Sequence, residues 1–176
     1  MKTIFLYENY KAALRQGAAM LLLCFLLGCE KDDICVDGDT PLLIIRFYDK
    51  DNPDMIKPVS SLRVTGSGMT APLPAVNRVT TDSIAIPLSA LANTSVFSFI
   101  SNSEDDGGGM ETGNTDVVHF NYDTFTVFVS RACGYVANYE NLTVMVDADA
   151  DNWITSTTVI NPTVTDGTKA HLHIFH

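Results

Sequence analysis

The chain has 176 residues, and its 21 acidic side chains outnumber its 11 basic ones, which gives a formal net charge of −10. A chain of this length has room for one domain beside a short terminal segment. The negative field of such a domain repels phosphate backbones, so the composition excludes nucleic acid as a partner.

The first predicted element is an export signal over residues 1–28. Its basic start is followed by an unbroken apolar run of ten residues, Ala18 to Leu27, which is shorter than the roughly 20 residues that span a bilayer. The run ends in Leu26-Leu27-Gly28-Cys29, which resembles the lipobox of bacterial lipoproteins. We therefore expect Cys29 to be lipidated and to begin a mature chain of net charge −12. The alternative is an uncleaved N-terminal helix.

Residues 29–40 are polar and predict a tether between the lipid and the domain. Just behind the cysteine stand Lys31, Asp32 and Asp33. They resemble the export signal of Bacteroidota lipoproteins, which is associated with the outer face of the outer membrane. The alternative is a charged tether without a signal. We expect a protein held at the outer membrane by its N-terminal lipid and facing the cell exterior.

From residue 41 to 176 the chain consists of short alternating or β-branched runs between turn residues, without a long stretch of helical period. About nine strands are predicted, over 42–48, 62–65, 83–88, 94–100, 116–122, 125–130, 141–146, 153–160 and 171–175. Asp123 and Thr124 predict a tight hairpin, and the acidic, glycine-rich loop 101–115 is expected to be solvated and mobile. The pattern predicts an all-β, antiparallel β-sandwich, with immunoglobulin-like, transthyretin-like and jelly-roll topologies left open.

Four segments together resemble a domain-of-unknown-function family of small Bacteroidota envelope lipoproteins; they are residues 32–35, 40–49, 129–135 and 170–174. The most specific of these contains Ser130-Arg131-Ala132-Cys133-Gly134. The resemblance would cover nearly all of the mature chain. It implies an envelope lipoprotein with a β-rich domain and no assigned activity.

Two cysteines remain in the predicted mature domain. Cys24 leaves with the signal and Cys29 is consumed by the lipid, so Cys35 and Cys133 are left. Exported compartments permit disulfides, and two cysteines admit one internal pairing. We therefore predict a disulfide between Cys35 and Cys133. The alternatives are two buried free thiols or a tether too mobile to hold the bond.

Two acidic clusters are candidate calcium sites. Asp147, Asp149 and Asp151 alternate as the ligands of some calcium loops do, because alternate side chains can converge when the backbone curls around the ion. The loop has Asn152 where an EF-hand has glycine and Thr158 where it has an acid. A second cluster comprises Asp49, Asp51 and Asp54. Both are interpreted as solvated turns.

The histidines are candidate zinc ligands. His171 and His173 lie two apart on one strand face, and His119 or His176 could add a third nitrogen. The alternation sets them opposite Leu172 and Ile174. We interpret them as a solvent-facing row, and no metal or cofactor is predicted.

No catalytic residues are predicted, because the chain has no Gly-x-Ser-x-Gly elbow and its glycine clusters lack the pattern of phosphate loops. The sequence predicts a lipid-anchored, non-enzymatic binding or scaffolding domain whose partner is an envelope protein or glycan. The alternative is a carbohydrate- or calcium-binding module, and a hydrolase ranks third. Clustered exposed aromatics near the strand ends would favour carbohydrate. The candidates are Tyr135, Tyr139 and Trp153, and the alternative is that they lie in the core of the sandwich.

Overall fold

The computed structural model describes residues 34–35 and 38–176. The export signal, the lipidation residue Cys29 and the export motif Lys31, Asp32 and Asp33 lie outside the described residues. The chain divides into a unit of residues 1–35 and a unit of residues 36–176, and every strand named below belongs to the second. Within the described residues, no helix is long and apolar enough to cross a membrane.

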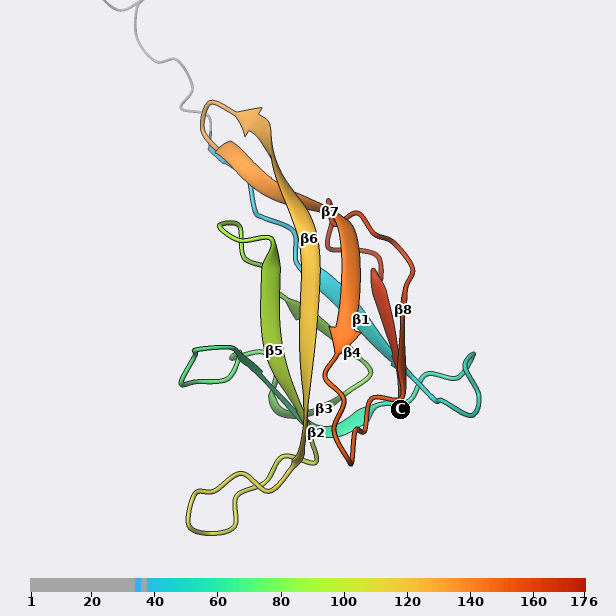
Figure 1. The fold of residues 1–176 in the computed structure, drawn as a ribbon. Coiled ribbons are helices and arrows are strands. Elements are labelled where there is room, and N and C mark those ends of the chain that lie inside the picture. The colour runs from blue at the N-terminus through green and yellow to red at the C-terminus, as the bar shows by residue number, and fades with distance from the viewer. Residues whose placement is uncertain (1–33, 36–37) are drawn as a thin grey trace, which may run out of the picture. The chain divides into compact units, whose positions relative to one another are not determined.

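The described residues form nine strands in two sheets (Figure 1), which confirms the predicted all-β sandwich. One sheet has the order β4-β1-β9-β8, from β1 (Leu43–Tyr48), β4 (Ser83–Ile86), β8 (Ser156–Val159) and β9 (Leu172–Phe175). The other has the order β3-β2-β5-β6-β7, from β2 (Val59–Gly66), β3 (Asn77–Thr81), β5 (Thr94–Ser101), β6 (Asn114–Ser130) and β7 (Gly134–Val146).

Alternating apolar residues of both sheets make the core. In β1, Leu43, Ile45 and Phe47 are fully buried, as their two-residue period predicts. In β6, Val118 and Phe120 are fully buried on the facing sheet. Each such side chain stabilises the fold by about 1.5–3 kcal/mol relative to an exposed one.

One pairing departs from the predicted antiparallel arrangement. β9 pairs with β1 in parallel, with Ile45 opposite Leu172 and Tyr48 opposite Phe175, while the other ladders are antiparallel. A parallel pair needs a long crossover connection, and here most of the domain lies between the two strands. β3 was not predicted, because its sequence NRVTT is polar and its residues stay largely exposed at the sheet edge.

The predicted hairpin at Asp123 and Thr124 is wrong. Both residues lie inside β6, where the pairing with β7 shifts between Asn121 and Asp123. On the partner strand Asn141 has a φ of 55°, and its Nδ2 donates to Asp123 Oδ2 at 2.8 Å. The polar pair therefore marks a β-bulge, which bends a strand without ending it.

The chain reverses instead at residues 131–133. Gly134 has a φ of 72°, which suits the left-handed position of a three-residue hairpin loop. Ser130 Oγ accepts a hydrogen bond from Cys133 N at 3.0 Å inside this turn.

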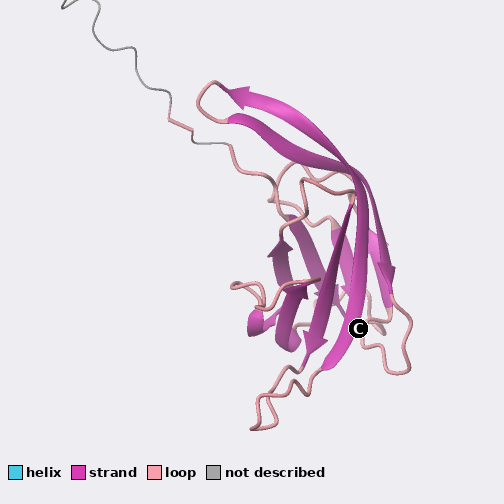
Figure 2. Ribbon diagram, turned by 60° about the vertical axis from the view of Figure 1, so that its left-hand side comes forward, coloured by secondary structure: helices cyan, strands magenta, loops and turns pink. Residues whose placement is uncertain are grey.

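β6 and β7 run on together past the end of β5. The first residue of β5, Thr94, pairs with Asn121, so the ladder beyond the bulge has no β5 neighbour. Figure 2 shows the resulting two-stranded hairpin projecting from the sandwich. We call residues 124–139 the arm and residues 127–135 its tip.

Candidate functional site

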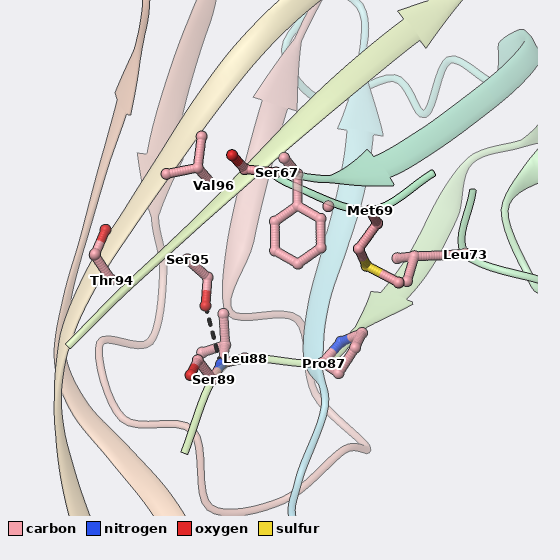
Figure 3. Close-up of a pocket in the computed structure, with 11 residues that line it drawn as sticks. Ser67, Met69, Leu73, Pro87, Leu88, Ser89, Thr94, Ser95 and Val96 are labelled. Carbon is pink, nitrogen blue, oxygen red and sulfur yellow. Dashed lines mark hydrogen bonds between the residues drawn. The ribbon is translucent and has the colours of Figure 1, made fainter. Parts of the chain in front are cut away.

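An open pocket of about 450 Å³ lies at the end of the sandwich from which the arm projects. The chain segments that line it are the end of β2, the start of β5 and the stretch after β4 (Figure 3). Its lining residues are Gly66, Ser67, Met69, Leu73, Pro87, Leu88, Ser89, Thr94, Ser95, Val96 and Phe97.

The pocket combines apolar walls with hydroxyl groups. Met69, Leu73 and Phe97 supply apolar surface, whereas Ser67 and Thr94 add groups that can donate or accept hydrogen bonds. None of the described residues that line it carries a formal charge. A lining of this kind suits a neutral ligand or an apolar side chain with a few hydrogen-bonding groups.

A closed ring of hydrogen bonds fixes one wall of the pocket. Ser89 N donates to Ser95 Oγ at 2.9 Å, and Ser95 Oγ lies 2.6 Å from the Tyr122 hydroxyl. The Tyr122 hydroxyl donates to Ser89 O at 3.0 Å, so the ring is satisfied when Ser95 donates to Tyr122. Three mutually oriented bonds hold the turn after β4 against the start of β5.

Tyr139 braces the same wall from β7. Its side chain is fully buried, and its hydroxyl donates to Leu88 O at 3.0 Å. Its ring meets that of Tyr122 edge-on with centroids 5.0 Å apart. Burial raises the pKa of Tyr139, which keeps the hydroxyl protonated as a donor. The base of the arm thus positions the pocket wall, and Tyr139 is a core residue that offers no exposed ring to a carbohydrate.

Trp153, the second aromatic candidate, is also structural. Its Nε1 donates to Phe99 O at 3.1 Å, and its ring lies 6.3 Å from that of Phe47. The buried carboxylate of Asp116 accepts from Trp153 N and Ile154 N at 3.3 and 2.8 Å, and burial raises the pKa of Asp116. Of the three aromatics that would favour carbohydrate, Tyr135 alone is exposed, at 72%.

The predicted solvent-facing histidine row is wrong for His171. That residue is 1% exposed, and its Nδ1 accepts a hydrogen bond from Ile44 N at 3.0 Å. His173 is half-buried, with its ring 4.4 Å from that of Tyr48. The buried His171 and the half-buried His173 therefore do not form an exposed row. Among the described residues, no group of three or more His, Cys, Asp or Glu side chains is placed to hold a metal ion.

The acidic clusters hold turns, as interpreted from the sequence. Asp149 Oδ1 accepts from Asp151 N at 3.0 Å, and Asn152 Oδ1 accepts from Asp149 N at 2.9 Å. Asp49 Oδ1 accepts from Asp51 N at 2.7 Å, and this backbone bond is the main cause of the lowered pKa of Asp49.

A polar cluster around Glu111 was not predicted, and it pins the ends of the loop 101–115. Glu111 Oε2 accepts from Ser103 Oγ at 2.7 Å and from Arg63 Nη1 at 3.0 Å. Burial works to raise the pKa of Glu111, but bonds from Ser103, Gly113, Glu104 and Arg63 outweigh it and bring the pKa to about 2. Residues 104–110 stay exposed. The loop is therefore solvated at its centre but anchored at its base.

Cys35 and Cys133 are both disulfide-bonded in the structure, which confirms the bond that the cysteine count predicts. Cys133 lies in the turn at the tip of the arm.

Comparison with protein families matches residues 61–176 to a family of unknown function. The match includes two of the segments on which the family resemblance rests, 129–135 and 170–174, and begins after the other two. No curated protein and no solved structure matches the chain. The matched part holds the pocket, the arm and all of the described strands except β1 and the first two residues of β2. The chain therefore belongs to the family of unknown function DUF6452.

Proposed function

We propose that this protein is a lipid-anchored lipoprotein of the Bacteroidota outer membrane that faces the cell exterior and binds a neutral part of another envelope component in its pocket. The binding is non-enzymatic. The observation that carries the proposal is the uncharged pocket wall held rigid by Ser89, Ser95 and Tyr122. A preformed, partly apolar concavity with a few fixed polar groups is the usual form of a binding site.

The lipid anchor rests on the residues at the start of the chain. The apolar run before Cys29, the lipobox-like Leu26-Leu27-Gly28-Cys29 and the following Lys31-Asp32-Asp33 support lipidation and export. Bacterial lipoprotein modification adds more than one acyl chain, and two chains suffice for stable anchoring.

Site-specific photo-crosslinking tests the pocket. A photoreactive residue replaces Met69, which is 52% exposed at the pocket, or Ile160, which is 51% exposed and is not a lining residue. In cells that make the lipidated protein, we expect a discrete adduct at position 69 and none at position 160. Ser67→Trp should fill the pocket and remove the adduct, whereas Ile160→Trp should leave it. Equal labelling at both positions would contradict the proposal.

Mass spectrometry tests the anchor separately. The mature chain should begin at Cys29 and carry added acyl mass, and Cys29→Ala should leave an unmodified precursor. A mature N-terminus elsewhere, without acyl groups, would refute the lipoprotein assignment.

A further inference from the structure

The tip of the arm exposes aromatic and aliphatic side chains to solvent. Phe128 and Tyr135 are 55% and 72% exposed, and they face each other across the hairpin with ring centroids 5.4 Å apart. Val127 is 40% exposed on the other face. The β7 half of the arm is buried from Val136 to Tyr139, so the exposed apolar surface is confined to the tip, and such a patch marks an interaction site.

The arm differs in charge from the rest of the chain. Residues 124–139 contain no Asp or Glu and one basic residue, Arg131, in a chain with 21 acidic and 11 basic side chains. Asp123 and Glu140 stand just outside the two ends of this stretch. An acid-free tip can approach a surface of phosphate groups that the rest of the domain would repel.

The arm projects from the same end of the sandwich at which the chain enters β1. β1 begins at Leu43, opposite Ile86 at the end of β4. The stretch that follows β4 is bonded through Ser89 to Ser95, near the start of β5, and through Leu88 to Tyr139 at the base of the arm. The chain therefore enters the domain at the end from which the arm projects.

We propose that the tip of the arm rests in the headgroup region of the membrane that holds the lipid, with Phe128 and Tyr135 at the boundary with the acyl chains and Arg131 on lipid phosphate. This inference rests on the proposed lipid anchor. Tyrosine is enriched at membrane interfaces because its ring is apolar and its hydroxyl is polar. Guanidinium groups pair well with phosphate oxygens.

Chain lengths allow this contact. The 14 residues from Cys29 to Leu43 span at most about 50 Å, whereas β6 from Asp123 to Ser130 extends only about 23 Å past the bulge.

Fluorescence quenching by brominated lipids tests the contact in the full, acylated protein. Phe128→Trp places a probe at the tip, and Met145→Trp places one at a residue that is 55% exposed near the far end of β7. Both variants are reconstituted in vesicles of phosphatidylethanolamine and phosphatidylglycerol, with and without bromine in the acyl chains. The wild type, whose sole tryptophan is Trp153, gives the background.

We expect brominated lipid to quench the Phe128→Trp probe and the bilayer to shift its emission to the blue, with neither effect for Met145→Trp. An acylated protein whose tip probe is not quenched would overturn this inference and leave the proposed function standing. A photoreactive residue at position 128 should label lipid; an adduct with another protein or with a second copy of this chain would also overturn it. A chain without acyl groups in the mass spectrum would overturn the anchor itself and the inference with it.

Discussion

The Nδ1 atom of His171 accepts a hydrogen bond from the backbone N–H of Ile44 at 3.0 Å, and the backbone N–H of His171 donates to Ile44 O at 2.9 Å. An accepting Nδ1 carries no proton, so the imidazole is neutral with its proton on Nε2. The two bonds join the start of β1 to the residue before β9 and help to set the parallel register. Burial lowers the pKa of His171.

This geometry predicts that stability falls in mildly acidic solution. The unfolded chain takes up a proton at His171 near its usual pKa of about 6.5, whereas the folded chain does so only at lower pH. Stability is therefore full above about pH 6.5 and declines as the pH falls from there toward the folded pKa. His171→Asn retains an acceptor without titrating, so its free energy of unfolding should fall less between about pH 7.5 and 5.

Urea titrations across this range measure the difference. Burial also lowers the pKa of His173 and His176, so both proteins should keep part of the slope, and the difference between them isolates His171. Identical slopes for wild type and His171→Asn would contradict the prediction.

Removing the Tyr139 hydroxyl should destabilise the domain and loosen the pocket wall. Tyr139→Phe leaves Leu88 O without its donor at 3.0 Å, and an unsatisfied buried acceptor costs about 1–3 kcal/mol. Tyr135→Phe makes the same chemical change at a side chain that is 72% exposed, and it should alter the free energy of unfolding by less than about 0.5 kcal/mol. Equilibrium unfolding of both variants measures the two changes in the free energy of unfolding, and equal changes would contradict the prediction.

Glu111→Gln should release the base of the loop 101–115. The carboxylate accepts charge-assisted bonds from Arg63 and Ser103, and hydrogen bonds to charged groups contribute about 1.5–3 kcal/mol. Because the folded pKa is about 2, against 4.5 for the free side chain, the stabilisation is present above about pH 4.5 and is lost as the pH falls toward 2. Limited proteolysis should cut the variant faster within residues 104–110, with the exposed Glu104→Gln as control.

The disulfide should account for a large part of the domain's stability. The bond closes a loop of about 100 residues, for which chain entropy gives an upper estimate of roughly 4–5 kcal/mol. Cys133→Ser should lower the melting temperature, and Cys35→Ser together with Cys133→Ser should lower it no further. Alkylation of the unreduced, denatured wild type should label neither cysteine; labelling of both would show that the bond is absent in the exported protein.

Surface display should depend on Lys31, Asp32 and Asp33. Protease added to intact cells should remove the wild-type domain, and alanine at all three positions should retain the lipidated protein inside, protected from the protease. Protection of the wild type, under conditions that cleave a known surface protein, would count against display.

The sequence by itself determined the strands whose two faces differ. β1, β4 and β5 were predicted within two residues at each end because one face packs in the core and the other does not, and that difference appears as a two-residue period. The cysteine count likewise determined the disulfide, because one pairing remains once two cysteines have other fates. β3 was not predicted, because an exposed, polar edge strand has no such period.

Only the tertiary structure decided which polar and aromatic side chains are buried. His171 is buried because its bonding partner Ile44, 127 residues away, belongs to a strand that pairs beside it in parallel. Tyr135 and Tyr139 lie four residues apart on one strand, yet the first is exposed on the arm and the second is buried at its base. Asp123 is of a residue type that is common in turns, but it lies within β6 beside a bulge. Whether a side chain is buried depends on neighbours that long-range strand pairing brings together. The periodicity of the local sequence does not reveal which segments those neighbours come from.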